Sequence, residues 1–436
     1  MGSTDKGEGK SKPQCGDIAM QKIAFDPANP RDALDELPGK AAVFALYGAD
    51  DGAEPYIGRT PNLRGRLERL LTPSAKHPKR LQLAGRVRRI LWRLSGSEFE
   101  SLLVQFSWLE KIYGAKALER MHLRTPALVR FLGSNPYPRV MVTNRLVQRE
   151  SEWTYGPFAS RVAAERYVEE MLKLFLLRRC TEELEPDPGN PGCIYSEMKM
   201  CLAPCYKGCT DERYAEEAAG VAAFLATRGE SRLVPLRSSR DAASANLDFE
   251  SAAALHAQVQ RIEAVRALAP ELVRPLSRLR VAILQAAANA GEVAVFLFEQ
   301  GSLSGPVGFS TAGMKIQNEA APSGEIAIQQ AEPDSAAVPD APAETESKIA
   351  RGALEARMEA TLNALRGECN AHSATLRQGH MALLKRWYYR PEIRRQGEIF
   401  FPAEDGRWPL KAMVRGAGRV AAKVLGPVNA EEPPSR

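Results

Sequence analysis

The cysteines of this chain are concentrated in one short segment. Five of the seven cysteines lie between Cys180 and Cys209, and four of them, Cys180, Cys193, Cys201 and Cys205, are separated by twelve, seven and three residues. In a cytosolic chain such cysteines are more often metal ligands than disulfides. Four thiolates suit a tetrahedral Zn²⁺ or a [4Fe-4S] cluster, and spacing does not choose between them. The segment is therefore predicted to fold around a metal centre, with Cys209 as a spare or alternative ligand.

The rest of the chain indicates a multidomain cytoplasmic protein that binds a polyanion. Its 436 residues are enough for two to four domains. The polar first residues lack the apolar stretch of a signal peptide, and no apolar run approaches the roughly 18 residues of a membrane span. The net charge is +6, and lysine and arginine crowd into the first half. We therefore expect nucleic acid as a partner and no membrane.

The first half is predicted to contain a small mixed α/β domain. AAVFALYG and PYIG read as two strands joined by a hairpin turn in ADDGAE. NLRGRLERLL, RVRRILWRL and EFESLLVQFSWLEKIYG each show helical spacing of apolar residues.

Later segments alternate between helical and strand patterns. Residues 163–177 and most of 211–269 have helical spacing, and RVAILQAA and VAVFLFEQG read as strands with a turn at 301–304. Residues 317–347 are rich in Ala, Pro, Glu and Ser and read as a linker. The tail beyond them is predicted to be helical and then strand-like.

The segment LPGKAAVFALYGADDGAEPYIGRTPNLRGRLERLL resembles the GIY-YIG nuclease module. The resemblance implies that Tyr56 is one of the motif tyrosines and that Arg66 neutralises phosphate charge in the transition state. A divalent ion, Mg²⁺ or Mn²⁺, would stabilise the leaving oxygen if the site is active. The residues expected to contact DNA are Arg59, Asn62, Arg64, Arg69, Lys79 and Arg80.

Two positions depart from the nuclease pattern. Phe44 stands where the first tyrosine belongs, although Tyr47 could be a shifted substitute. Gln105 stands where the module has its metal-binding glutamate, and a neutral amide is a poor anchor for Mg²⁺. Glu98, earlier in the same predicted helix, is an alternative carboxylate. Whether the motif cuts DNA is therefore left open by the sequence.

The cysteine region carries the second part of the resemblance. YGPF followed by a helix, then LFLLRRC, CIY and CLAPC, is similar to the cysteine-rich region of the UvrC family of excinucleases. This similarity implies a [4Fe-4S] cluster at Cys180, Cys193, Cys201 and Cys205, with zinc as the alternative.

AASANLDFESAAALHAQVQRIEAV resembles the UVR motif, a helical hairpin through which the UvrB and UvrC components of the excinuclease pair. The resemblance implies that Leu247, Asp248, Phe249 and Glu250 form the turn that binds a UvrB-like helicase subunit, with Phe249 as the apolar anchor. The plain alternative is an alanine-rich hairpin that packs on its own domain.

The resemblance fades beyond residue 269. The strands near 293–311 look like the opening of the family's RNase H-like domain, but the acidic residues of a two-metal nuclease and the helix-hairpin-helix repeats are absent from the sequence. The tail is basic and aromatic. Trp387, Tyr388 and Tyr389 could stack on nucleic acid or form part of a small core.

Together these features predict an α+β multidomain protein with a GIY-YIG-type domain, a helical cysteine-rich and UVR region, and a degenerate α/β C-terminal region. The predicted regions are a mobile N-terminus (1–33), the nuclease-like domain (34–125), the cysteine region (150–210), the UVR hairpin (211–270), the RNase H-like remnant (280–312), a linker (313–348) and a divergent tail (349–436). The expected function is nucleotide excision repair on damaged double-stranded DNA with a UvrB-like partner, including one incision. The rival expectation is a catalytically inactive adaptor that only binds DNA and partner.

Overall fold

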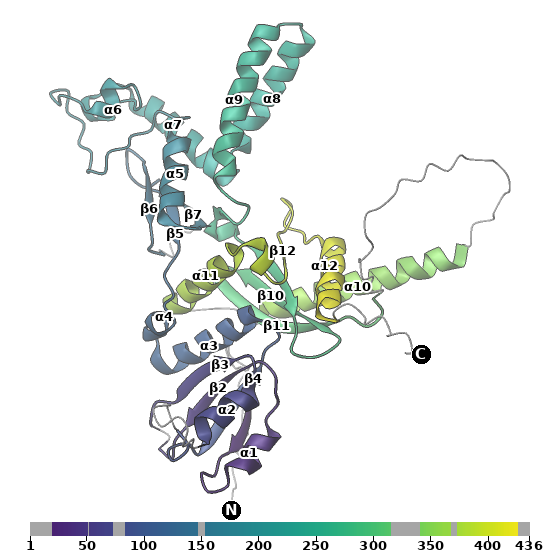
Figure 1. Ribbon diagram of the computed structural model, residues 1–436. Coiled ribbons are helices and arrows are strands. Elements are labelled where there is room, and N and C mark those ends of the chain that lie inside the picture. The colour runs from purple at the N-terminus through teal and green to yellow at the C-terminus, as the bar shows by residue number, and fades with distance from the viewer. Residues whose placement is uncertain are drawn as a thin grey trace, which may run out of the picture.

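The computed structural model describes residues 20–50, 52–72, 83–146, 153–314, 341–367 and 373–425. Within these residues the chain forms three antiparallel four-stranded sheets together with helices α1 to α12. Figure 1 shows the N-terminal sheet, the second sheet with the cysteine region and a projecting helical hairpin, and the C-terminal sheet as separate parts of the molecule. The mixed α/β class expected from the sequence is confirmed at this level.

The first sheet has the strand order β1-β4-β2-β3, with β3 at an edge. Its strands are β1 (Gln21–Ala24), β2 (Ala42–Tyr47), β3 (Tyr56–Thr60) and β4 (Arg89–Leu94). Helices α1 (Pro30–Glu36) and α2 (Leu63–Leu71) bury their apolar side chains against one face of it. The predicted β2–β3 hairpin and helix α2 are confirmed. The expected mobile start is corrected from Gln21 onward, because β1 pairs with β4, while residues 1–19 lie outside the described chain.

The helix expected in RVRRILWRL is wrong, because residues 89–94 form strand β4. Ile90 and Trp92 are buried on one side of the strand, which is the two-residue period of a sheet. A short apolar run does not separate strand from helix by period alone. Pairing with β1 and β2 on both sides decides the outcome.

Helix α3 (Glu98–Tyr113) is confirmed, and it links the first sheet to the third. Ser97 caps its N-terminus by accepting a hydrogen bond from the Glu100 amide at 3.1 Å. Phe99 and Phe106 enter one apolar core with side chains of the third sheet and helix α11. The short helix α4 (Lys116–Arg120) follows it. The first and third sheets are therefore held together by a shared core.

The second sheet carries the cysteine region. It contains β5 (Ala127–Phe131), β6 (Val140–Thr143), β7 (Thr154–Phe158) and the short β8 (Arg274–Pro275). Helix α5 (Arg161–Leu172) packs on it and ends five residues earlier than predicted, at Leu172 rather than at residue 177. After α5 the chain contains the short helix α6 (Ile194–Glu197), a 3-10 turn at Pro204–Tyr206 and helix α7 (Asp211–Ala226).

Helices α8 (Glu230–Ala245) and α9 (Phe249–Ala267) form an antiparallel hairpin that extends away from the body of the molecule in Figure 1. Only Leu233 of α8 and three residues in the second half of α9 are buried. The base of the hairpin is therefore anchored, and its far half is surrounded by solvent.

The third sheet joins two regions that are distant in the sequence. Its strands are β9 (Val281–Ala286), β10 (Glu292–Glu299), β11 (Ser302–Ser310) and β12 (Glu398–Phe400), in the order β11-β10-β9-β12. The strands predicted in 280–311 are confirmed. Because β12 pairs with β9, the tail completes this sheet rather than forming a region of its own.

Three helices accompany this sheet: α10 (Ala341–Gly367), α11 (Ala374–Tyr388) and α12 (Leu410–Leu425). The linker is predicted to extend to residue 348, but helix α10 already begins at Ala341. Residues 315–340 lie outside the described chain. The tail is helical and then strand-like as predicted, and it ends in a further helix. No helix among the described residues is both long enough and apolar enough to cross a membrane.

Candidate nucleic-acid site, cysteine cluster and helical hairpin

The structure brings Tyr56 and Arg66 together. The Asn62 side chain caps α2 by accepting a hydrogen bond from the Gly65 amide at 2.9 Å, so the helix begins directly after β3. This short connection places the Arg66 guanidinium 3.5 Å from the Tyr56 hydroxyl. Both side chains are half-buried. The pair can present a phenol and a cation to one phosphate group.

Phe44 lies beside this pair but supplies no hydroxyl. Its ring centroid is 6.1 Å from that of Tyr56, and its side chain is fully buried. Phe44 lies opposite Gly58 in the hairpin register, and a Cβ on Gly58 would come within 2.8 Å of the Phe44 ring. Glycine at this position is therefore required by close ring packing.

Tyr47 does not replace the missing hydroxyl. Leu46 is paired directly with Tyr56, so their side chains share one face of the sheet, and Tyr47 must point to the opposite face. There the Arg89 guanidinium lies 4.9 Å from the centre of the Tyr47 ring. The shifted-tyrosine alternative is therefore wrong.

The two carboxylates in the first turn of α3 are already engaged. The Arg390 guanidinium donates to both oxygens of Glu98, at 2.7 and 2.9 Å, and Arg59 approaches at 3.4 Å. The hydrogen bonds from Arg390, with the charges of both arginines, lower the pKa of Glu98 to about 2. Glu100 is buried and accepts a hydrogen bond from the Gly96 amide at 2.8 Å.

Gln105 is half-buried on α3, and among the described residues no hydrogen bond joins it to Tyr56 or Arg66. In the described part of the chain, no group of three or more His, Cys, Asp and Glu side chains lies in an arrangement that could hold a metal ion, and this includes the four predicted cysteine ligands. The residues present therefore do not fit a Mg²⁺ site beside Tyr56.

The other predicted DNA-contacting residues have mixed placements. The Arg64 guanidinium donates to the backbone carbonyls of Leu37 at 2.7 Å and Asp35 at 2.8 Å, which ties α2 to the end of α1. Arg69 is exposed and donates to the Gly65 carbonyl at 2.8 Å. Lys79 and Arg80 lie outside the described residues.

The four predicted metal-ligating cysteines are free thiols and lie close enough to influence one another. Burial, together with the charges of Cys180, Cys193 and Cys205, raises the pKa of Cys201 to about 11. Two sulfur atoms also accept hydrogen bonds, Cys201 from the Ala203 amide at 3.3 Å and Cys180 from the Arg178 guanidinium at 3.6 Å. Such donors stabilise sulfur that carries negative charge, as in metal-bound thiolates.

Cys209 lies at the edge of the core beneath this region. Burial is the largest cause of its raised pKa, and none of the other four cysteines is among the causes. Cys209 therefore lacks the electrostatic influence that the four predicted ligands exert on one another.

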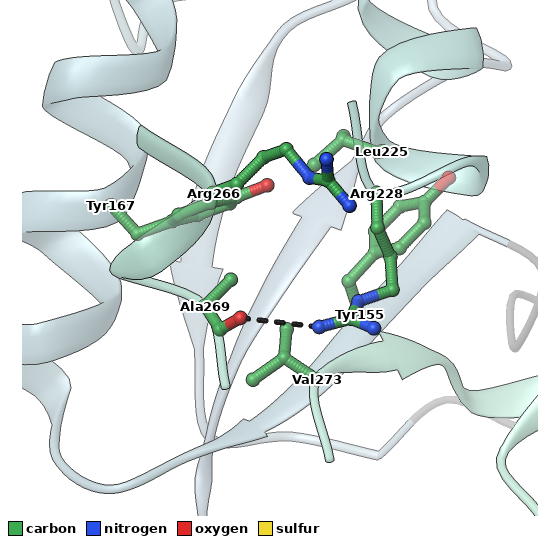
Figure 2. A pocket seen from close by; sticks show the side chains of 7 residues that line it. All are labelled: Tyr155, Tyr167, Leu225, Arg228, Arg266, Ala269 and Val273. Atoms are coloured by element: carbon green, nitrogen blue, oxygen red, sulfur yellow. Dashed lines mark hydrogen bonds between the residues drawn. The ribbon is translucent and has the colours of Figure 1, made fainter. Parts of the chain in front are cut away.

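The base of the hairpin is held by two arginines around a small cavity (Figure 2). Arg228, in the turn before α8, donates to the Ala269 carbonyl at 3.5 Å, and Arg266 of α9 forms an ion pair with Glu230 at 2.8 Å. Tyr155 of β7 and Tyr167 of α5 line the same cavity. The hairpin therefore meets the cysteine-bearing domain through a buried, partly polar base.

The tip of the hairpin presents two apolar side chains to solvent. Leu247 is 73% exposed and Phe249 is 66% exposed. Leu247 has a positive φ of 61°, and Asp248 caps α9 by accepting a hydrogen bond from the Ser251 amide at 3.1 Å. Glu250 is exposed in the first turn of α9. The structure places the turn at residues 246–248, so Leu247 and Asp248 lie in it as predicted, whereas Phe249 and Glu250 form the first turn of α9. Leu247 and Phe249 belong to none of the apolar cores of the described chain.

Comparison with known proteins shows which proteins the chain is similar to. The middle domain of UvrC/Cho excinucleases matches residues 128–224, which contain the second sheet's first strands, α5 and all four predicted cysteine ligands. This part of the chain is similar to the middle domain of UvrC/Cho excinucleases. The chain is also 28% identical over 238 residues to UvrABC system protein C of Ruminiclostridium cellulolyticum, covering 53% of this chain and 38% of that protein. It is 28% identical over 294 residues to the protein of the same name from Desulforudis audaxviator, covering 67% of this chain and 47% of that protein.

The chain thus spans less than half the length of these UvrC relatives, and no solved structure matches it. The resemblance to UvrC predicted from the sequence is confirmed. In the tail, Trp387 is only 4% exposed, and the Tyr389 hydroxyl donates to the Pro157 carbonyl at 2.8 Å, so these two aromatic side chains take part in the packing of the fold.

Sequence reasoning missed Arg390, which reaches the nuclease-like domain from the end of α11. Its partner Glu98 lies 292 residues away in the sequence, so no local signal could have indicated the contact.

Proposed function

We propose that this chain is a UvrC-like protein of nucleotide excision repair that binds damaged double-stranded DNA and a UvrB-like helicase subunit. The observation that carries the proposal is the combination of the matched middle domain with a projecting hairpin whose apolar tip, Leu247 and Phe249, has no partner among the described residues. An exposed apolar anchor on a rigid support is the usual form of a helical docking site.

The nuclease-like domain is proposed to act mainly as a DNA-binding adaptor. Phe44 offers no hydroxyl, Gln105 is not a carboxylate, and Glu98 is neutralised by two arginines. Metal-assisted hydrolysis of a phosphodiester needs a carboxylate to hold the ion. What remains beside Tyr56 is a cationic surface suited to phosphate binding.

Incision of one strand is the second candidate. It is favoured by the contact between Tyr56 and Arg66, since this is the pair that would orient a nucleophile and neutralise a phosphate. This candidate requires a carboxylate from outside the motif or from a partner.

The test is incision of end-labelled, lesion-bearing duplex DNA with a UvrB-like subunit and Mg²⁺ or Mn²⁺. The adaptor proposal expects no product from the wild-type chain, with DNA binding retained. Cleavage that disappears in Tyr56→Phe and in Arg66→Ala would overturn it in favour of incision. Gln105→Glu is the informative gain-of-function variant, because it restores a carboxylate at the position where the module has one.

We also propose a [4Fe-4S] cluster at Cys180, Cys193, Cys201 and Cys205, with zinc as the alternative. The charges of the other three cysteines act on Cys201, and N–H groups of Arg178 and Ala203 point at two of the sulfurs. As placed, the four sulfurs do not form a metal-holding group, so binding a cluster would require them to move together. The cluster would have a structural role, because it would hold the long segment between α5 and α7. Anaerobically purified protein should be brown and contain iron, whereas a colourless protein with one zinc per chain would replace the cluster by zinc.

The partner proposal is tested at the hairpin tip. Phe249→Ser should weaken binding of a UvrB-like subunit in a titration, because it removes the exposed apolar anchor. Val234→Ser is a matched control, since Val234 is 60% exposed on α8 away from the tip. Equal affinity of both variants and the wild type would mean that the tip is not the docking site.

A further inference from the structure

The loop between α11 and β12 presents an apolar side chain at its tip. Ile393 is 94% exposed, the largest exposed fraction of any large apolar residue in the described chain. It lies in a single 3-10 turn, Glu392–Arg394. A large aliphatic group with this exposure has no role in the fold.

The loop is nevertheless held in place. The Arg395 amide donates to the Pro391 carbonyl at 3.0 Å, and the Arg395 guanidinium donates to the Tyr388 carbonyl at 3.1 Å. The Gln396 carbonyl accepts a hydrogen bond from the buried Trp387 indole at 3.0 Å. Both sides of the turn are therefore tied to α11, and Ile393 is displayed from a fixed support.

Exposed arginines flank the tip in the sequence. Arg394 is exposed beside Ile393, Arg386 is exposed near the end of α11, and Glu392 is the one acidic residue in the turn. Arg390, at the start of the loop, is bound to Glu98 of α3.

The same Glu98 carboxylate holds Arg59, which lies on β3 three residues after Tyr56. β3 is an edge strand, so Tyr56 on one face and Arg59 on the other both border the free edge of the first sheet. The loop therefore approaches the free edge of the first sheet from the face that carries Arg59, and Tyr56 and Arg66 lie on the opposite face of that edge.

We infer that this loop is a DNA-contacting wedge: the exposed Arg394 binds a phosphate of a duplex that lies along the β3 edge, and Ile393 inserts between neighbouring base pairs. An apolar side chain framed by arginines is the combination by which proteins unstack a base step and bend DNA. The inference rests on the proposed DNA-binding function and extends it by naming the element that distorts the duplex.

The experiment uses the full chain and duplex DNA with 2-aminopurine at successive positions. Binding of the wild type should raise 2-aminopurine fluorescence at one step, since unstacking relieves quenching. Ile393→Ser should abolish this rise and weaken binding about tenfold through loss of apolar contact. Arg394→Gln should reduce the steepness of the salt dependence by about one phosphate contact.

Val162→Ser is the matched control, because Val162 is 73% exposed on α5 and lies in a different domain. It should leave both the fluorescence rise and the affinity as in the wild type. If Ile393→Ser binds DNA with the affinity of the wild type and gives the same fluorescence rise, the wedge is overturned and the proposed function stands. Absence of DNA binding by the wild type would overturn the proposed function and the wedge with it.

Discussion

His380 is a buried histidine at the contact of α11 with β11 and α3, and it should make the stability of the protein depend on pH. Its side chain is 2% exposed, and its Nδ1 accepts a hydrogen bond from the Leu303 amide at 3.1 Å. This bond requires a neutral ring with its proton on Nε2, which has no hydrogen-bond partner among the described residues. The Phe106 ring, 5.8 Å away, covers it from α3.

The sign and size of the effect follow from the pKa. Burial lowers the pKa of His380 from 6.5 to about 4. Above pH 6.5 the ring is neutral in both the folded and the unfolded chain, and the stability contribution is fully present. As the pH falls from 6.5 towards 4, only the unfolded chain takes up the proton, so the free energy of unfolding decreases. At about 1.4 kcal/mol for each pKa unit, the free energy lost over this range is at most about 3–4 kcal/mol.

His380→Asn is the informative variant, because its side-chain oxygen can accept the Leu303 amide proton and does not titrate. Urea unfolding of the wild type and the variant would be followed by fluorescence at several pH values between about 4.5 and 7.5. The wild type should lose stability relative to the variant on acidification, because every other titrating group is common to both. A difference in unfolding free energy that stays constant over this range would refute the reasoning.

Three further substitutions test packing around the candidate site. Gly379→Ala should lower the free energy of unfolding by about 1–3 kcal/mol in urea titrations, because the added Cβ would lie 1.9 Å from the Phe106 ring. Stability equal to the wild type would mean that α3 and α11 are not in close contact. Phe44→Tyr should cost about 1–3 kcal/mol by burying an unpaired hydroxyl, measured by thermal unfolding, and an unchanged melting temperature would show that the ring edge is accessible. Ser97→Ala should cost about 1 kcal/mol by removing the cap of α3, and faster hydrogen exchange confined to the first turn of α3 would identify the cause.

The sequence determined the local elements and the family. The β2–β3 hairpin follows from two apolar runs separated by Asp and Gly, and α2 follows from the spacing of its leucines after the Asn62 cap. The turn at Leu247 is predictable because Asp248 is a strong cap before a helical pattern. The grouping of the cysteines indicates the UvrC-like region without any knowledge of the fold. Each of these features depends on residues that are neighbours in the chain.

Tertiary structure decided the remaining questions. Residues 89–94 became a strand because β1 and β2 supply hydrogen-bonding partners on both sides. Tyr47 was excluded from the site because the register with Tyr56 puts it on the other face of the sheet. Strand β12 of the tail pairs with β9 of the third sheet, and Arg390 forms an ion pair with Glu98. In both cases the partners are more than 100 residues apart in the sequence. The period of apolar residues in a short segment does not specify which distant segment it will pack against. That distant segment determines which side chains become buried and which charged groups form ion pairs.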